Sequence, residues 1–404
     1  MKTILYQTTL LAMLCIGTAQ AQQIDLPDGR DFSIADVFYP GLHLDMAAGG
    51  SSAEPDELEI GGHDPSRDGF TLQSLELDLS VRLNDYVEGF AAWNLFWGGA
   101  EEEWGDEWEE VFGKLTNLPG GLEVRGGRML SRFGIRNAKH QHSWSAVDQN
   151  LMIVRFLGED GLAQDGADVT WYMPTPITTA LTVSYGEVKA HSHGHEEVPH
   201  HEDEHSSHND EAAGQEIQFA DEFFSGNIVA QVNYDDFNQF AFGGSLATGD
   251  NGLGGDTQIY ALNASYTWRE NGLEAGGRYL IWNNEAMLRD YDVGDGGHDD
   301  EHLDEDHDDE SDMRGDHEVG FSSELIYGMN DILDVGARLG YVAGIDEIGL
   351  RKRYRLSPLT TIYLSQKRNL FLRLQYSYDD WEGGLDAHSA WAQLHYSFGG
   401  VEVR

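Results

Sequence analysis

Apolar and polar residues alternate with a period of two in several segments of this chain, and this alternation constrains the fold more than any other feature. Leu75, Leu77 and Leu79 lie on one face of such a segment, and Glu76 and Asp78 lie on the other. Segments of about ten residues with one apolar and one polar face are typical of a transmembrane β-barrel. A soluble β-sandwich alternates in the same way, so the connections between segments must decide. The same pattern recurs in residues 86–97, 258–268 and 371–378.

The connections between these segments fall into two classes that alternate strictly along the chain. One class is short, as in residues 84–85 and 174–176, and the other is long or polar, as in residues 188–225 and 286–316. Short periplasmic turns and long extracellular loops distinguish a bacterial outer-membrane barrel. We therefore predict an all-β fold, a transmembrane antiparallel β-barrel of about 16 strands with both termini in the periplasm. The predicted strands are residues 36–47, 70–83, 86–97, 106–116, 121–130, 163–173, 177–187, 226–234, 239–247, 256–268, 273–285, 317–328, 332–343, 350–365, 370–379 and 386–398.

The first 21 residues have the features of a secretory signal peptide. Lys2 supplies a basic start, residues 10–16 form a short apolar run, and Ala19-Gln20-Ala21 matches the A-x-A cleavage pattern. We expect export, removal of residues 1–21, and a mature barrel formed by residues 22–404.

Composition excludes several classes of function. A net charge of -46 excludes nucleic acid as a partner, because the phosphate backbone needs a basic surface. No apolar run of about 18 residues follows the signal peptide, so no transmembrane helix is predicted. Cys15 in the signal peptide is the single cysteine, so a metal site would have to use histidine and carboxylate. Ser143 follows His142, but no G-x-S-x-G motif or triad pattern is present, so we do not expect an enzyme.

Two stretches rich in histidine and acid, residues 190–214 and 290–317, lie in the long loops 188–225 and 286–316 and cannot pack a core. They hold eleven of the 17 histidines. Imidazole and carboxylate are ligands for Zn²⁺, Cu²⁺ and Ni²⁺, so we expect capture of a divalent metal, with zinc favoured, and no tightly bound cofactor. The alternative is a solvated low-complexity segment. The predicted ligands are His191, His193, His195, His200, His201, His205, His208, His298, His302, His307 and His317.

The long third loop, residues 131–162, contains a further pair of candidate metal ligands. His140 and His142 are two residues apart, which on a strand would place both on one face within reach of one metal ion. Asp148 would join them if the loop folds back. The alternative is that both histidines hydrogen-bond the loop to the barrel wall.

A family resemblance is carried by the segment that leads into this loop. LEVRGGRMLSRFG, residues 122–134, is similar to the strand that precedes the third loop in the phosphate-selective porin O/P family, and the preceding EWEEVFGKL resembles that family's descending strand. The pattern H-x-H-x-W…VD…L…FLGE-x-GL-x-x-x-G resembles more closely a subgroup of porin-like outer-membrane proteins associated with zinc supply. The motifs cover about 50 residues.

The resemblance implies a passive channel that residues 131–162 constrict by folding into the barrel. Charged side chains at such a constriction tune selectivity, or they pair with acids and hold the loop in place. The family's phosphate-selective members carry many lysines in the pore, whereas this chain has few, so phosphate is not the expected solute. An acidic mouth concentrates cations. The predicted pore-lining residues are Arg125, Arg128, Arg132, Arg136 and Arg155, with Lys139 beside them.

Three functions therefore remain open. The first is a channel whose surface loops bind divalent metal, zinc above all, for passage into the periplasm. The second is a surface protein that sequesters metal without uptake, and the third is a general or anion-selective diffusion porin. The expected partners are the lipid bilayer of the outer membrane, divalent cations and the barrel-assembly machinery, because WAQLHYSF resembles the terminal strand that this machinery recognises. A homotrimer is the expected association by analogy of fold.

Overall fold

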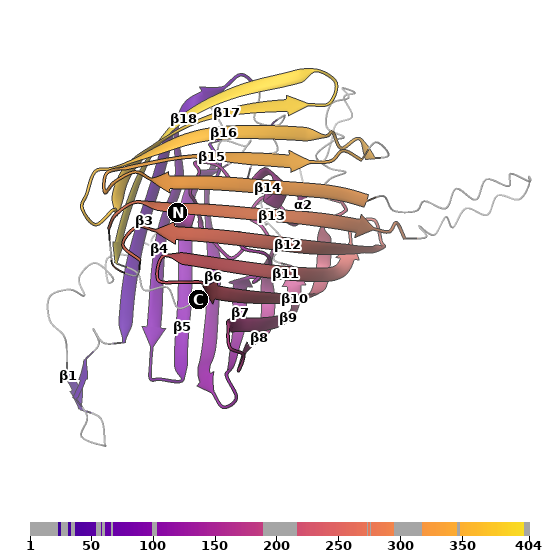
Figure 1. Ribbon diagram of the computed structural model, residues 1–404. Coiled ribbons are helices and arrows are strands. Elements are labelled where there is room, and N and C mark those ends of the chain that lie inside the picture. The colour runs from indigo at the N-terminus through magenta and orange to yellow at the C-terminus, as the bar shows by residue number, and fades with distance from the viewer. Residues whose placement is uncertain are drawn as a thin grey trace, which may run out of the picture.

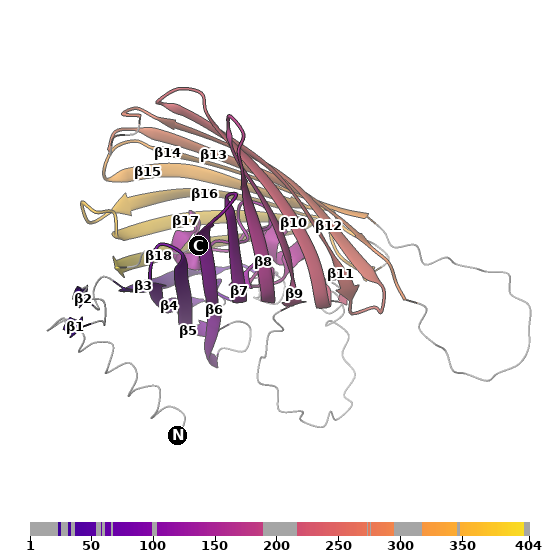
Figure 2. The same cartoon turned by 90° about the horizontal axis from the view of Figure 1, so that it is seen from below.

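Sixteen antiparallel strands, β3 to β18, form a closed barrel (Figures 1 and 2). The computed structural model describes residues 23–25, 31–33, 37–53, 58, 61–65, 68–98, 103–188, 216–272, 274, 276–294, 317–345 and 348–399. A separate pair of short strands, β1 (Gln23–Asp25) and β2 (Asp31–Ser33), precedes the barrel. The barrel strands are β3 (Phe38–Ser51), β4 (Gly69–Arg82), β5 (Val87–Gly98), β6 (Glu103–Leu118), β7 (Leu122–Leu130), β8 (Ala163–Met173), β9 (Thr178–Val188), β10 (Phe219–Asn233), β11 (Asn238–Asn251), β12 (Asp256–Arg269), β13 (Tyr279–Tyr291), β14 (His317–Gly328), β15 (Leu333–Val342), β16 (Arg353–Tyr363), β17 (Leu370–Trp381) and β18 (Leu385–Gly399).

The last strand closes the sheet on the first. β18 pairs with β3 from Ser389 opposite Ser51 to Gly399 opposite Gly41. Closure satisfies the backbone groups of every strand, which a lipid environment requires because no water is available to pair with a free edge. The predicted all-β barrel and its strand number are confirmed. None of the helices in the described part of the chain is long and apolar enough to cross a membrane.

The two faces of the wall have opposite character. On β4 the buried inward side chains include Glu76 and Asp78, whereas large apolar side chains on other strands, such as Leu262 at 72 % exposure, cover the outer face. This inside-out distribution is expected when the outer face contacts lipid and the inner face contacts water or polar side chains.

The predicted strand positions agree with the structure to within a few residues except at β10, which begins at Phe219 where residue 226 was predicted, and at β13. Residues 273–285 were predicted, but the strand spans Tyr279–Tyr291 because a longer turn precedes it. The N–H of Glu270 donates to the carbonyl of Arg278 (2.8 Å), and the Arg278 guanidinium pairs with the Glu270 carboxylate (2.7 Å). Gly276 and Gly277 both adopt positive φ, which ends any extended backbone at this point.

Several connections on the long-loop side are shorter than predicted, because their strands continue further. Residues 99–102, 252–255 and 382–384 are all that join β5 to β6, β11 to β12 and β17 to β18. The remaining polar residues of those loops belong to strands.

Residues 131–162 fold back into the barrel and form its apolar core. They contain a 3₁₀ turn, η3 (Gln141–Ser143), and a short helix, α2 (Leu151–Leu157), whose first turn is capped by the Asn150 side chain. α2 lies against β13, β14 and β15 (Figure 1). Its Met152 and Phe156 pack with wall residues such as Met287 in the largest buried apolar cluster. Apolar packing therefore fills this side of the barrel.

Two β-bulges turn additional side chains into the barrel on the opposite side. The β3–β4 register shifts beside Asp45, and Gln73 and Ser74 both become buried. The β5–β6 register shifts so that Ala92 pairs with Glu110 and the next residue pairs with Trp108, which leaves Glu109 as the extra residue. A bulge re-aims side chains that a regular strand would place on the other face.

Candidate functional site

The inserted loop is attached to the wall at many points. The backbone N–H groups of Gly134 and Ile135 donate to Ser245 Oγ (2.9 Å) and Glu285 Oε1 (3.0 Å) on β11 and β13. On the far side, the N–H of Val147 donates to Gln375 Oε1 on β17 (2.8 Å). The loop thus spans the inside of the barrel.

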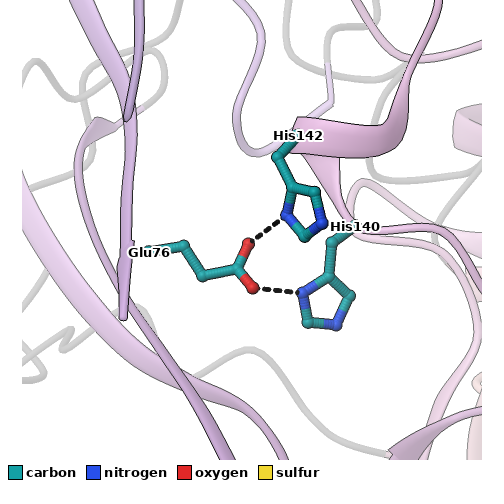
Figure 3. Close-up of side chains that lie close together, drawn as sticks. All are labelled: Glu76, His140 and His142. Carbon is teal, nitrogen blue, oxygen red and sulfur yellow. Dashed lines mark hydrogen bonds and ion pairs between the residues drawn. The ribbon is translucent and has the colours of Figure 1, made fainter. Parts of the chain in front are cut away.

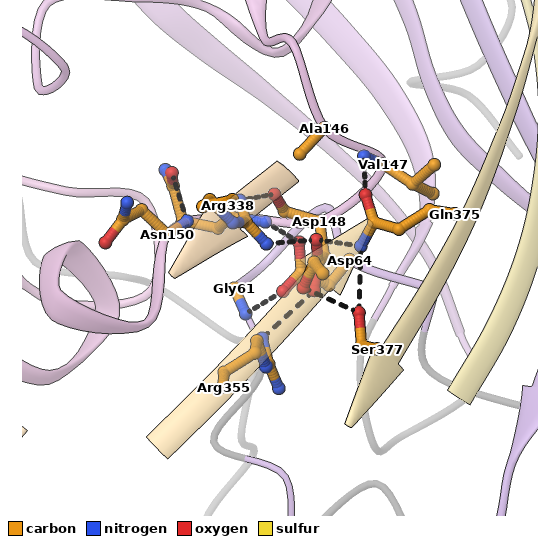
Figure 4. Close-up of polar contacts among 12 residues, drawn as sticks. Gly61, Asp64, Ala146, Val147, Asp148, Asn150, Arg338, Arg355, Gln375 and Ser377 are labelled. Carbon is orange, nitrogen blue, oxygen red and sulfur yellow. Dashed lines mark hydrogen bonds and ion pairs between the residues drawn. The ribbon is translucent and has the colours of Figure 1, made fainter. Parts of the chain in front are cut away.

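Asp148 holds the centre of this loop against β15, β16 and β17 (Figure 4). It pairs with Arg338 and with Arg355 (Nη1 to Oδ2, 3.0 Å), and it accepts a hydrogen bond from Gln375 Nε2 (2.6 Å). Burial disfavours the charged carboxylate, but the two guanidinium groups outweigh burial and lower the pKa of Asp148. Asp148 was expected to join His140 and His142, and that expectation is wrong because the arginines engage it.

Asp64 connects the loop between β3 and β4 to the inserted loop. It accepts hydrogen bonds from the backbone N–H groups of Gly61 (2.8 Å) and Gln149 (2.5 Å). Burial, followed by the negative charge of Asp148, raises the pKa of Asp64 to about 7. Both loops therefore meet at a carboxyl group that changes charge near neutral pH.

We expect the contact between these two loops to tighten as the pH falls from about 8 to about 5. Because the folded state raises the pKa of Asp64 above its ordinary 3.8, its stabilising contribution is fully present below 3.8 and is lost as the pH rises through about 7. Protection against hydrogen exchange at the amides of Gly61 and Gln149, corrected at each pH for the intrinsic exchange rate, measures this. The pH dependence should disappear in Asp64→Asn; a variant that keeps it would assign the effect to another group.

The five predicted pore arginines all pair with acids, but not all face the lumen. Arg125 pairs with Asp168 on the neighbouring strand β8, and both side chains are buried on the inner face of the wall. Inside the barrel, Arg132 pairs with Glu123 (2.8 Å), Arg136 with Glu324 (3.4 Å) and Arg155 with Glu318 (3.3 Å). Arg128 pairs with Asp165 (2.7 Å), on the outward face of β7 that alternation assigns to even-numbered residues. Arg128 therefore does not line the pore, Arg125 joins two strands of the wall, and the other three hold the loop and wall together.

His140 and His142 converge on one carboxylate (Figure 3). His140 Nδ1 lies 2.8 Å from Glu76 Oε1, and His142 Nδ1 lies 2.9 Å from Glu76 Oε2. The two histidines were expected on a strand, but His140 caps η3 and His142 lies within it, so the turn brings the rings together. Their ligand atoms and that of Glu76 lie within 4.8 Å of one another, a grouping able to hold a metal ion.

The β6 bulge adds two more carboxylates to this group. His140 Nδ1 lies 2.9 Å from Glu109 Oε2, and His140 Nε2 lies 2.9 Å from Glu110 Oε2. Trp108 and Val111 on either side of the pair both point outward, at 48 % and 44 % exposure. We call Glu76, Glu109, Glu110, His140 and His142 the inner group.

A line of polar side chains continues from the inner group along β3 and β18 of the wall. The ring of His142 stacks on that of His43, with centroids 3.8 Å apart. His43 Nδ1 lies 2.8 Å from Ser397 Oγ, and the same hydroxyl lies 2.6 Å from His395 Nε2. His395 Nδ1 in turn lies 2.8 Å from Asp45 Oδ1. Imidazole and oxygen ligands thus follow β3 and β18 from the inserted loop.

Most of the surface histidines lie outside the described residues. These are His191, His193, His195, His200, His201, His205, His208, His298, His302 and His307. His317 begins β14, where its Nδ1 lies 2.5 Å from Asp290 Oδ1 and its side chain is 70 % exposed. It remains a predicted surface ligand at the base of its loop.

Comparison with known proteins yields little from sequence and more from structure. No protein-family model matches the chain. A curated relative, an uncharacterized protein of Aquifex aeolicus, is 33 % identical over 140 residues, which make up 32 % of this chain and 28 % of the relative. This match leaves more than two thirds of either protein unaligned.

The barrel is similar to solved outer-membrane channels. The anion-selective porin from Comamonas acidovorans gives a TM-score of 0.56 at 12 % identity, over 89 % of this chain and 99 % of that one. Pseudomonas putida OprB at high pH gives 0.56 at 11 %, over 90 % and 95 %. The channel DcaP of Acinetobacter baumannii gives 0.52 at 11 %, over 89 % and 96 %. The chain thus has, as predicted, the fold of outer-membrane porins.

Proposed function

We propose that this protein is an outer-membrane channel for divalent metal cations, with zinc as its main cargo. The observation that carries the proposal is the inner group, where His140 and His142 on the inserted loop share Glu76 on the wall. Imidazole nitrogen and carboxylate oxygen are the donors that zinc prefers where thiolate is absent. Ligands of tetrahedral zinc lie about 3.3 Å apart, so small side-chain movements would close this group around an ion.

The line from His142 to His395 suits passage of the ion. Conduction requires sites that bind well enough for the ion to arrive and weakly enough for it to leave. His43, Ser397 and His395 offer successive donors on the wall beside the inner group, so a cation leaving the inner group finds further ligands there. The resemblance to a zinc-associated porin subgroup supports the same cargo.

The histidine-rich surface loops would supply the channel. Shortening residues 190–214 and 295–316 to tight turns should remove most weak zinc sites measured by calorimetry. It should also lower zinc flux into liposomes on the order of tenfold at low zinc, because a charged mouth raises the arrival rate of its ions. Flux at high zinc should be unchanged. Equal flux at every zinc concentration would favour a sequestering surface instead.

An anion-selective or general diffusion porin is the second candidate. Arg136, Lys139 and Arg338 help to line a small hollow of about 30 Å³ between the inserted loop and the wall. The Comamonas acidovorans neighbour is described as anion-selective. However, Arg338 is engaged by Asp148 and Arg136 by Glu324, which reduces the positive charge offered to a solute.

The reversal potential of the full-length channel in asymmetric salt separates these two candidates. Cation selectivity together with zinc flux supports the proposed function, and chloride selectivity without zinc flux contradicts it. We also propose a trimer, the form described for Vibrio cholerae OmpT, whose barrel gives a TM-score of 0.51. The mass of the detergent-solubilised protein tests that association.

A further inference from the structure

A second set of metal-ligating atoms lies beside the inner group, and it is drawn from three separate segments. His63 belongs to the loop between β3 and β4, Glu107 belongs to β6, and Asp160 lies near the end of the inserted loop. His63 Nε2 lies 3.4 Å from Glu107 Oε1 and 3.9 Å from Asp160 Oδ1. The ligand atoms of these three residues fall within 4.8 Å of one another. We call them the outer group.

A hydrogen bond to the His63 backbone and an aromatic contact with its ring fix the position of His63. Gln73, which the β4 bulge turns inward, donates through Nε2 to the carbonyl oxygens of His63 (3.0 Å) and Val147 (2.8 Å). The imidazole is 93 % buried, and Phe96 meets it edge-on with ring centroids 4.8 Å apart. A ring held by its own backbone and by an aromatic neighbour presents Nε2 to the carboxylates in one orientation.

Glu109 connects the outer group to the inner group. Its Oε1 lies 3.3 Å from His63 Nε2, and its Oε2 lies 2.9 Å from His140 Nδ1. One carboxylate thus offers one oxygen to each group. The bulge in β6 is what makes this arrangement available, because a regular strand would turn either Glu109 or Glu110 outward.

The combined charge of the two groups favours divalent cations. Together they contain five carboxylates and three imidazoles, so these eight side chains would carry a net charge of -2 even if every histidine were protonated. Burying unbalanced negative charge is costly, and a bound cation relieves that cost.

The two groups differ in their access to solvent. The Glu107 and Asp160 side chains are each 16 % exposed, whereas Glu76 is 1 % exposed and the His140 side chain is fully buried. A cation coming from the loops would therefore meet the outer group first.

We propose that His63, Glu107 and Asp160 form a second divalent-metal site that shares Glu109 with the inner group and passes the cation inward. This inference rests on the proposed function, since it assigns the same ion an ordered pair of sites. It makes the loop between β3 and β4 a part of the binding machinery.

Anomalous scattering at the zinc edge, from crystals of the full-length protein soaked in Zn²⁺ alone, tests the proposal. We expect two peaks, one at each group. His63→Ala should remove the outer peak, keep the inner peak, and weaken zinc flux at low zinc by on the order of ten- to a hundredfold. Glu107→Gln, which preserves the shape of the side chain, should reduce the outer peak if His63→Ala does not fold. His388→Ala is the matched control, because His388 is 53 % exposed and hydrogen-bonds the outward-facing Tyr376.

The outcomes distinguish this proposal from the proposed function. No outer peak in the unaltered protein, or an outer peak that survives His63→Ala, overturns the second site whatever happens at the inner group. An outer peak without an inner peak and without zinc flux supports metal binding at the outer group but contradicts both its passage inward and the channel function.

Discussion

Replacing His140 and His142 together by alanine should lower zinc flux through the barrel by on the order of a hundredfold and leave potassium conductance within about twofold. The two rings provide the nitrogen ligands of the inner group, and both contact Glu76. Without them, three carboxylates remain, which attract any cation but do not select zinc over potassium. The measurement is zinc-indicator fluorescence in liposomes beside single-channel conductance in potassium chloride.

The comparison of zinc flux with potassium conductance distinguishes a metal site from a purely structural role of the two histidines. If the histidines only attach the inserted loop to the wall, their loss should alter zinc flux and potassium conductance in parallel, and the inner group would not be a metal site. His388→Ala again serves as the control, because it removes an imidazole from the outer surface. Heat-modifiable migration on gels verifies that each variant forms the barrel.

The barrel itself could be predicted from sequence because its determinants are local. Lipid offers no hydrogen-bond partners, so the strands must pair with one another in a closed barrel. Because the lipid interior is apolar, each strand must also present apolar residues outward at every second position, as Leu75, Leu77 and Leu79 do. Alternating short and long connections then set the order of the strands. The error at β13 arose where apolar Leu273 and Ala275 continue the pattern across a turn that Gly276 and Gly277 form.

The alternation of strand side chains also distinguishes the two arginines of β7. Arg125 and Arg128 are three residues apart on one strand, and an odd separation places their side chains on opposite faces. Arg125 is buried with Asp168, and Arg128 is outside with Asp165. The prediction that both arginines line the pore was therefore wrong for Arg128.

The site was only half visible, because its members are far apart in the chain. The spacing of His140 and His142 was a usable signal, but Glu76 is 64 residues from His140 and looked like any residue on a polar face. Glu109 and Glu110 left one trace: two adjacent acids between Trp108 and Val111 break the alternation. That break marks the bulge, although two adjacent acids could also have suggested a helix. His63 carried no local signal, since its partners Glu107 and Asp160 lie far from it in the chain.

Replacing Asp148 by asparagine should release the inserted loop from β15–β17 and shift the channel toward anions. Asp148 is the shared partner of Arg338 and Arg355. Its loss leaves two buried guanidinium groups without this carboxylate, and breaking a buried pair in this way costs about 3–5 kcal/mol. The loop should move until water and chloride reach the arginines. We expect a conductance increase of about twofold or more and a reversal potential displaced toward that of chloride.

Asp165→Asn provides a matched control for this change. Asp165 also pairs with an arginine, Arg128, but this pair is 45 % and 35 % exposed on the outer face, where an ion pair contributes only about 0–1 kcal/mol. The control should leave conductance and selectivity unaltered. If Asp148→Asn behaves in the same way, then Gln375 and the Val147 amide suffice to hold the loop, and Arg338 and Arg355 do not set selectivity. If it opens the channel to anions, one carboxylate separates a cation channel from the anion-selective behaviour described for the Comamonas acidovorans neighbour.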